Sequence, residues 1–191
     1  RGYEVWYALE ELAYRGSSRP DPVAAVNERL NGSPPVRFEI RPYGDLWFKD
    51  YIRVEGDAFE AMRRAKDFRP HNVTVENDNP IRRRELAEEQ WDNIFLGFEI
   101  DASGREALVV EGSVEGDFFD EVAVDPAHRG KGYGRAMTDY CVNLLLDRGY
   151  ARPRTSVVVG NEPAQSMYHR MGFQPIQVNE WARLSLEENE G

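Results

Sequence analysis

Apolar residues in the first part of the chain recur at the spacing of an α-helix. This spacing predicts an amphipathic helix over residues 3–15, with four apolar positions on one face: Val5, Leu9, Leu12 and Ala13. A second helix is predicted over residues 21–32, because Asp21 is a good N-cap and Pro22 suits the first helical position. The stretch SPP at residues 33–35 then forms a stiff break.

From residue 36 onwards, apolar and polar residues alternate along several segments. Residues 94–100 place four apolar side chains on one face, which is typical of a half-buried strand. Short turns join this strand to two more, so we predict an antiparallel meander of three strands. The other predicted elements are a strand over 36–41, helices over 57–68 and 80–91, a helix after 134, a strand over 154–160, a helix over 163–171, and strands near 173 and over 181–186.

We therefore predict one α/β domain over residues 36–191, preceded by a helical N-terminal arm over residues 1–35. A chain of 191 residues suits one domain with a substantial core. The arm carries more aromatic surface than one helix face can bury: Tyr3, Trp6, Tyr7 and Tyr14. These side chains would cover the substrate side of the domain or contact a second copy of the chain in a homodimer.

The net charge of −10 disfavours non-specific binding to nucleic acid or to an anionic membrane, so we expect neither as a partner. It suits a cationic substrate, although acidity can also serve solubility alone. Cys141 is the single cysteine, and the three histidines have no metal-ligand spacing, so we expect no disulfide and no metal. We see no signal peptide and no membrane-spanning run, and we expect a cytoplasmic protein.

The stretch RGKGYG at residues 129–134 lies between a predicted strand and a predicted helix. Backbone N–H groups at a helix start favour an anion, and glycines let the backbone approach a phosphate closely. Arg129, Lys131 and Arg135 add positive charge, so we predict a diphosphate site. The dinucleotide pattern G-x-G-x-x-G and the P-loop pattern G-x-x-x-x-G-K-[ST] are both absent. The spacing is R-x-x-G-x-G instead.

Two stretches resemble the signature motifs of the GNAT superfamily of N-acetyltransferases. VAVDPAHRGKGYGRAM resembles the acyl-coenzyme A motif of that family, and VVVGNEPAQSMYHRMGF resembles its second motif. Together they fall within residues 118–175, in the order and spacing of the family. The resemblance implies a single GNAT fold, which is a mixed, mostly antiparallel sheet of six to seven strands flanked by helices. The helical N-terminal arm would be an addition to it.

The resemblance implies acetyl-CoA as the co-substrate. In the family, the strand before the loop pairs with the pantetheine arm, and the matching residues here are Val122, Ala123 and Val124. The N–H of Val124 would stabilise the oxyanion. The diphosphate would lie on Arg129, Gly130, Lys131, Gly132, Tyr133, Gly134 and Arg135, with the Arg129 side chain bonded within the loop. Asn161 would contact the pantetheine or brace the loop, or it would only cap the next helix.

Tyr168 matches a family tyrosine that protonates the leaving thiolate of coenzyme A. A phenol with an ordinary pKa of about 10 is a suitable acid for a thiolate whose conjugate acid has a pKa of about 8.5. The alternative is a core aromatic, since Tyr168 shares a helical face with apolar residues.

The acceptor amine must lose a proton before it attacks, and Glu121 is our first candidate for the general base. Glu121 shares a strand face with Ala123 and could face the acceptor. The other acidic candidates are Asp117, Asp120 and Glu99. A water chain without a single base is a further alternative that the family often uses.

These features together predict an acyl-CoA-dependent N-acyltransferase. It would transfer the acetyl group of acetyl-CoA to a primary amine of a small molecule or protein, by direct attack in a ternary complex. The alternative is a non-catalytic acyl-CoA-binding sensor or a module of a larger protein. A third reading is transfer of a longer acyl group.

Overall fold

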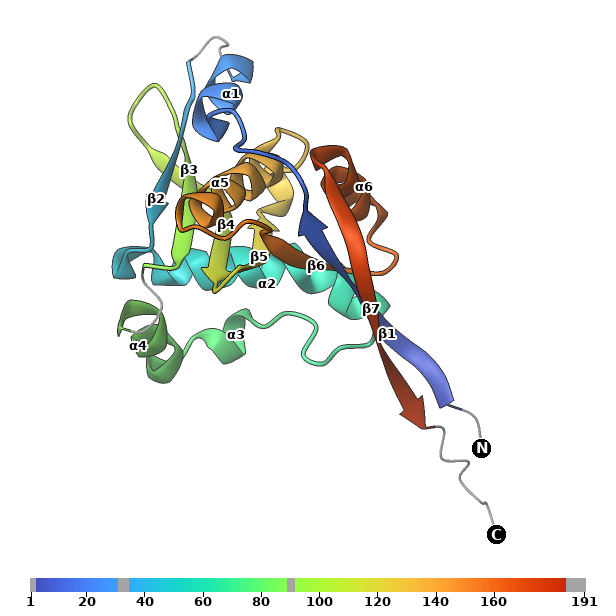
Figure 1. Ribbon diagram of the computed structural model, residues 1–191. Coiled ribbons are helices and arrows are strands. Elements are labelled where there is room, and N and C mark those ends of the chain that lie inside the picture. The colour runs from blue at the N-terminus through green and yellow to red at the C-terminus, as the bar shows by residue number, and fades with distance from the viewer. Residues whose placement is uncertain (1–2, 31–34, 89–91, 185–191) are drawn as a thin grey trace. The chain divides into compact units, whose positions relative to one another are not determined.

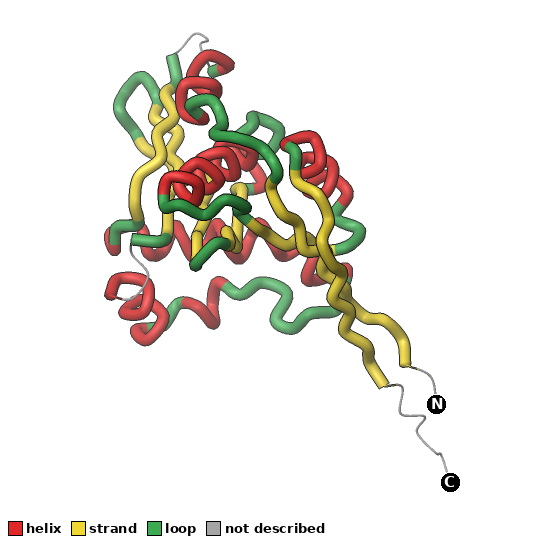
Figure 2. The backbone as a smooth tube through the Cα atoms, viewed as in Figure 1, coloured by secondary structure: helices red, strands yellow, loops and turns green. Residues whose placement is uncertain are grey.

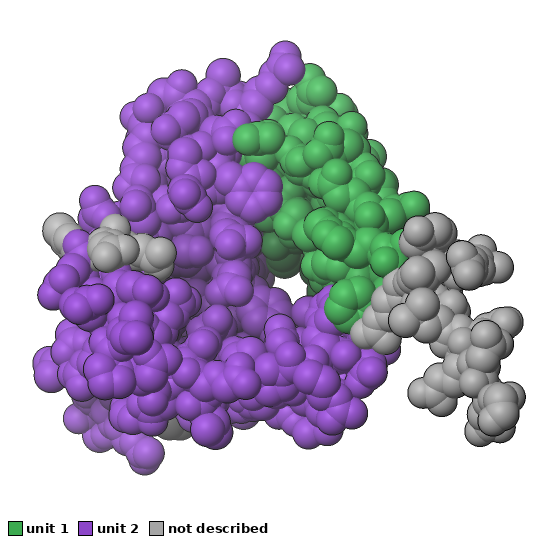
Figure 3. Space-filling view, turned by 90° about the horizontal axis from the view of Figure 1, so that it is seen from below, with its two compact units in different colours: residues 1–16, 154–191 green, residues 17–153 purple. Residues whose placement is uncertain are grey.

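The computed structural model describes residues 3–30, 35–88 and 92–184. The chain divides into two compact units, coloured in Figure 3. Unit 1 contains residues 1–16 and 154–191, and unit 2 contains residues 17–153. Each unit has its own antiparallel strands and at least one helix (Figures 1 and 2).

Unit 2 contains the predicted meander. Strands β3 (Ile94–Ile100), β4 (Glu106–Glu115) and β5 (Phe118–Val124) pair in sequence as antiparallel neighbours, and β2 (Arg37–Pro42) pairs with β3 on its other side. Unit 1 adds three strands, so the chain has seven in its described part. All the strand pairs within the units are antiparallel. The prediction of six to seven mostly antiparallel strands flanked by helices is confirmed.

Helices α2 (Phe48–Ala65) and α5 (Tyr133–Asp147) cover opposite faces of the unit 2 sheet (Figure 1). The smaller helices of this unit are α1 (Pro22–Arg29), α3 (Thr74–Asn77) and α4 (Pro80–Glu88), with 3₁₀ turns η1 (Asp45–Trp47) and η2 (Pro126–His128). Asp21 caps α1 through its side chain, as predicted. The predicted helix start at Asp57 is wrong, because α2 begins nine residues earlier.

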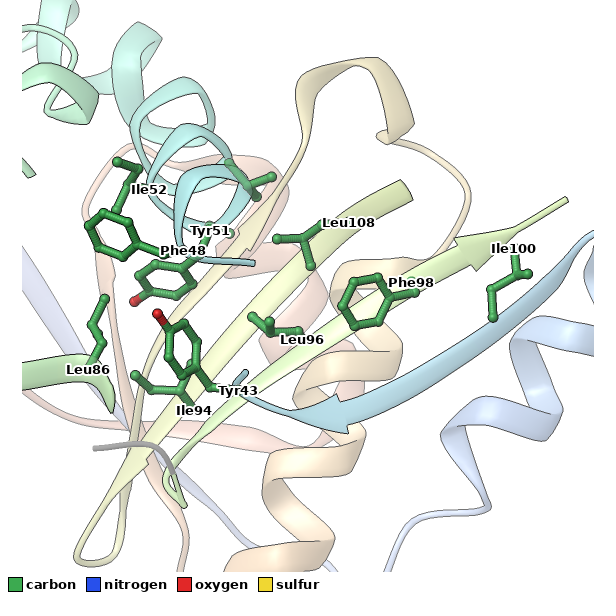
Figure 4. Packing of buried hydrophobic residues seen from close by; sticks show 12 residues of the cluster. Tyr43, Phe48, Tyr51, Ile52, Leu86, Ile94, Leu96, Phe98, Ile100 and Leu108 are labelled. Atoms are coloured by element: carbon green, nitrogen blue, oxygen red, sulfur yellow. The ribbon is translucent and has the colours of Figure 1, made fainter. Parts of the chain in front are cut away.

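The core of unit 2 lies between α2 and the sheet. Side chains of α2 interlock with one face of β3, and Leu108 of β4 and Ala123 of β5 complete the layer (Figure 4). Tyr43 and Tyr51 pack edge to face, with ring centroids 5.8 Å apart. This layer matters for function because it fixes the side of β4 and β5 on which Glu111 and Glu121 lie.

Unit 1 corrects the prediction for the start of the chain. Residues 3–14 form strand β1 (Tyr3–Tyr14), which pairs antiparallel with β6 (Arg154–Val158) on one side and β7 (Phe173–Leu184) on the other. The predicted helix over 3–15 is therefore wrong. The β1–β7 register shifts twice, once after Val5 and once after Glu11, so the inward positions do not keep a strict period of two. The broken alternation imitates helical spacing.

The predicted short strands near 173 and over 181–186 are one strand, β7, within the described residues. Two aromatic residues of β1 pack against it: Tyr14 on Phe173 and Tyr7 on Trp181, with ring centroids 5.2 and 5.1 Å apart. Helix α6 (Glu162–Met171) completes unit 1. The two compact units follow strand pairing, with β1 in unit 1 and α1 in unit 2. The division into an arm of residues 1–35 and a domain of residues 36–191 stays a prediction.

Candidate functional site

The glycine loop joins the end of β5 to the start of α5 in unit 2. Gly132 has a φ of 91°, in the left-handed region that L side chains rarely adopt, and α5 begins at the next residue. A Cβ on Gly134 would lie 3.1 Å from Cγ2 of Val124, so this glycine lets α5 start close against β5. The first N–H groups of a helix have no intrahelical acceptor, and the dipole makes that end positive. The loop therefore presents backbone donors in an arrangement that suits anions.

The charged side chains of the loop are held by neighbours in unit 2. Arg129 donates from Nη2 to the carbonyl of Ala58 in α2 at 2.7 Å, so the prediction that it bonds within the loop is wrong. Lys131 donates from Nζ to Glu99 at 2.9 Å. The Nε of Arg135 lies 3.6 Å from Oδ2 of Asp139, one helical turn further on in α5. These contacts fix the loop on the unit 2 scaffold.

Tyr133 is buried beneath the loop. Its ring lies 4.9 Å from the ring of Phe38, and its hydroxyl donates to Glu99. Burial, followed by this hydrogen bond, raises the pKa of Tyr133 well above its usual range. Only the backbone of Tyr133 is therefore offered to a ligand. Glu99 accepts from both Tyr133 and Lys131, so it is a structural partner of the loop in this arrangement.

Strand β5 directs alternate backbone groups to its two edges. The N–H of Asp125 donates to the carbonyl of Val109 in β4 at 2.9 Å. Successive N–H groups of a strand point in opposite directions, so the N–H of Val124 points away from β4. The predicted oxyanion donor is therefore not used by the β4 ladder. By the same alternation, the backbone N–H of Ala123 points toward its partner Glu111 in β4, so Val122 and Val124 are the residues whose backbone groups point away from β4.

A buried carboxyl cluster lies on the face of β4 and β5 that α2 covers. Glu111 stands opposite Leu96 of β3 and Ala123 of β5, and it is fully buried. Neither of its carboxyl oxygens has a hydrogen-bond partner among the described residues. Burial raises the pKa of Glu111 well above its ordinary value, and the neighbouring Glu121 and Glu55 raise it further. A neutral carboxyl is the form that this apolar setting favours.

Glu121 lies at the more accessible side of this cluster, two residues before Ala123 on the same strand face. Burial raises the pKa of Glu121 to about 8, and the charges of Glu55 and Asp120 raise it further. Arg82 of α4 opposes this shift electrostatically. A carboxylate with a raised pKa near neutrality is matched to proton abstraction at physiological pH. Asp120, on the other strand face, is exposed.

Glu55 and Glu111 are acidic members of this cluster that the sequence motifs did not predict. Glu55 follows Tyr51 by one helical turn on the apolar face of α2, and Asn77 donates to it at 3.2 Å. Burial raises the pKa of Glu55. Each residue is an acidic side chain at an apolar position of its element, and this signal could have found both. Arg82 of α4 contributes positive charge to this cluster, and its Nε is buried.

We expect Glu111→Gln to make stability less dependent on pH. A buried acid with a raised pKa is protonated in the folded state and ionises in the unfolded state above its ordinary value of 4.5. Wild-type stability should therefore fall as pH rises above that value, by at most about 1.4 kcal/mol per pH unit for one proton. Urea unfolding of wild type and variant at pH 5 and pH 8 measures this. The exposed Glu76→Gln is the control; equal slopes in all three proteins would contradict the expectation.

Unit 1 holds the two remaining candidates, Asn161 and Tyr168. Asn161 caps α6, since its Oδ1 accepts from the N–H of Ala164 at 3.4 Å. The capping reading is therefore confirmed, and contact with pantetheine stays a prediction. Tyr168 is buried, and its ring packs edge to face on Phe173 with centroids 5.5 Å apart. Tyr168 is therefore a core aromatic residue, and its role as an acid stays a prediction.

Cys141 is fully buried in α5, and burial raises its pKa to about 12, so it is a packing residue. Within the described ranges, no helix has the length and apolar character needed to cross a membrane. Trp91, at the end of the helix predicted over 80–91, lies outside the described residues.

Comparison with known proteins agrees with this geometry. The model of the Acetyltransferase (GNAT) family matches residues 77–173. Mycothiol acetyltransferase of Beutenbergia cavernae is 35% identical over an alignment of 186 residues, which covers 92% of this chain. This chain spans only 57% of that relative's length.

Solved structures show the same fold. A GCN5-related N-acetyltransferase from Sphaerobacter thermophilus superposes with a TM-score of 0.59 at 17% identity, over 95% of this chain and 52% of that one. The PaiA N-acetyltransferase from Thermoplasma acidophilum, solved in complex with coenzyme A, gives a TM-score of 0.52 at 14% identity, over 75% of this chain and 99% of that one. The chain belongs to the acetyltransferase (GNAT) family.

Proposed function

We propose that the chain transfers the acetyl group of acetyl-CoA to a primary amine. The observation that carries the proposal is the left-handed Gly132 directly before α5, in a glycine loop whose N–H groups at the helix start suit an anion. The residues present fit a coenzyme A diphosphate. The loop offers several amide donors and local positive charge in a chain of net charge −10.

The proposed reaction is direct attack in a ternary complex. The amine nitrogen attacks the thioester carbonyl, the N–C bond forms, and the C–S bond breaks. The N–H of Val124 would stabilise the oxyanion, and Glu121 would take the proton that the ammonium loses. Tyr168 would give a proton to the leaving thiolate, and the second proton that the nitrogen loses as the amide forms would restore the tyrosine. Wild-type Glu121 is suited to its part because its raised pKa makes it a stronger base than an exposed glutamate.

The acceptor would be a cationic amine, such as a polyamine, an aminoglycoside-like compound, an amino acid derivative or a protein amine. The net charge of −10 supports this choice, because a negative overall field favours a cationic ligand. The name of the relative, mycothiol acetyltransferase, adds the acceptor of that enzyme to the candidates.

A reducing cytoplasm would suit the single, buried Cys141. Association as a homodimer also remains part of the proposal.

A panel of amines tested for thiol release from acetyl-CoA examines the proposal. Release that depends on one amine class supports an acetyltransferase and identifies the acceptor class. Binding of acetyl-CoA without thiol release for any amine would favour the acyl-CoA sensor instead. Faster thiol release from a longer acyl-CoA would identify that acyl-CoA, and not acetyl-CoA, as the preferred donor.

Tyr168→Phe should lower kcat for thiol release by about a hundredfold, because the variant lacks the proposed acid. The phenylalanine ring keeps the packing on Phe173, so the melting temperature should change little. KM for acetyl-CoA should also stay near the wild-type value. Tyr140→Phe, which changes a half-buried phenol of α5, serves as the control. An unchanged kcat in a folded Tyr168→Phe protein would exclude the acid role.

A further inference from the structure

Arg29, the last residue of α1, lies directly over the glycine loop. A Cβ built on Gly132 would be 2.8 Å from Nη1 and 2.9 Å from Nη2 of Arg29. Only glycine at this position leaves room for the guanidinium to approach so closely. Gly132 thus has two requirements, its left-handed backbone and the space for Arg29.

The free ends of this guanidinium are turned to the loop. The Nε of Arg29 donates to the carbonyl of Ala25 in its own helix at 3.1 Å, which orients the group. In the described part of the chain, no carboxylate lies within ion-pair distance of Arg29. The loop cations differ in this respect, since Lys131 and Arg135 face carboxylates and Arg129 is bonded to α2.

The helix that carries Arg29 is tied down on both sides. Before α1, Arg19 donates from Nε to Asp139 of α5 at 2.6 Å, and Arg19 and Asn143 exchange two hydrogen bonds. Within α1, Asn27 exchanges two hydrogen bonds with the backbone of Phe38 in β2, at 2.7 and 3.0 Å. Helix α1 also packs against α5 (Figure 1). Arg29 is therefore positioned before any ligand arrives, which lowers the entropy cost of using it.

We propose that Arg29 is a phosphate-binding residue of the acetyl-CoA site, supplied by α1 from outside the glycine motif. This inference rests on the proposed function. A guanidinium matches the oxygens of a phosphate in a bidentate geometry, and here it adds to the amide donors and the dipole of α5. Because Arg29 lies over Gly132, we assign it to the diphosphate rather than to the 3′-phosphate of the coenzyme.

Calorimetric titration of coenzyme A into wild type, Arg29→Gln and Arg29→Lys tests the inference without any turnover. Loss of a charge-assisted hydrogen bond should raise the Kd of Arg29→Gln by about tenfold to a hundredfold. Arg29→Lys keeps the charge but loses the fork, so its Kd should be intermediate. Wild-type affinity should also fall more steeply with salt than that of Arg29→Gln. Arg69→Gln, which removes an exposed cation paired with Asp67, should bind as wild type does.

Dephospho-coenzyme A, which lacks the 3′-phosphate, separates the two phosphates. An equal loss for both ligands supports the diphosphate assignment, and a loss confined to coenzyme A would overturn it in favour of the 3′-phosphate. A Kd of Arg29→Gln equal to that of Arg69→Gln would overturn the role of Arg29 and leave the proposed function standing. A wild-type protein that binds neither ligand would overturn the proposed function itself.

Discussion

Glu121→Gln should lower kcat/KM by about 10²–10³-fold, because the proposed general base is replaced by an amide that cannot take a proton. The carboxyl is half-buried beside Glu55 and Glu111, in a setting that raises its pKa and so its strength as a base. Binding of acetyl-CoA should be unchanged, since Glu121 lies on the α2 face of β5 and not in the glycine loop. Steady-state kinetics with the acceptor found in the panel measure the effect.

The pH dependence provides a stricter test of the same residue. Glu121 must be ionised to accept a proton, and its pKa is raised to about 8, so wild-type kcat/KM should fall as pH drops through that value. In Glu121→Gln, this acidic limb of the pH–rate profile should be absent. Glu55→Gln removes a charge that raises the pKa of Glu121, so its limb should move to lower pH. A limb that follows the pKa of different acceptor amines, and persists in Glu121→Gln, would belong to the substrate.

Gly132→Ala should raise the Kd for coenzyme A by about a hundredfold or more. Gly132 has a left-handed backbone, and a residue with a Cβ in that conformation costs about 1–2 kcal/mol. The added methyl group would also lie 2.8 Å from Nη1 of Arg29. The flexible Arg29 side chain would shift aside, but relief of the backbone strain moves the loop and misdirects amide donors, each worth about 1.5–3 kcal/mol toward a charged group. Calorimetric titration measures the change.

Gly104→Ala is the matched control for backbone strain. Gly104 has a φ of 83° in the turn between β3 and β4, and nothing lies within 4 Å of a Cβ placed there. Gly104→Ala should lose about as much stability as Gly132→Ala does, but it should keep the wild-type affinity for coenzyme A. Normal affinity in a folded Gly132→Ala protein would mean that the coenzyme does not depend on this loop geometry.

The meander, the glycine loop and α5 could be predicted because each has a strong local signal. Period-two alternation marks β3, and Gly132 marks the turn into the helix. Strand β1 could not be predicted, because two register shifts against β7 break its alternation. Those shifts depend on a partner more than 160 positions away in the sequence.

The candidate site divides in the same way. The loop residues follow from the motif, whereas Arg29 and Glu111 depend on tertiary placement. Arg29 reaches the loop only because Asn27 and Arg19 fix α1 to β2 and α5. Glu111 becomes a buried, unpartnered carboxyl only when Leu96 and Ala123 close around it. An acidic residue at an apolar strand position marks Glu111 in the sequence, but its buried environment and the position of Arg29 depend on these distant neighbours.

Transfer of an isotopically labelled acetyl group tests the central claim most directly. The protein is incubated with labelled acetyl-CoA and the acceptor amine, quenched during turnover, and both protein and acceptor are analysed by mass spectrometry. Direct transfer in a ternary complex predicts label on the amine nitrogen, an equal amount of free coenzyme A thiol, and no label on the protein. Coenzyme binding without label on any amine, or label retained covalently on the protein, would contradict the account.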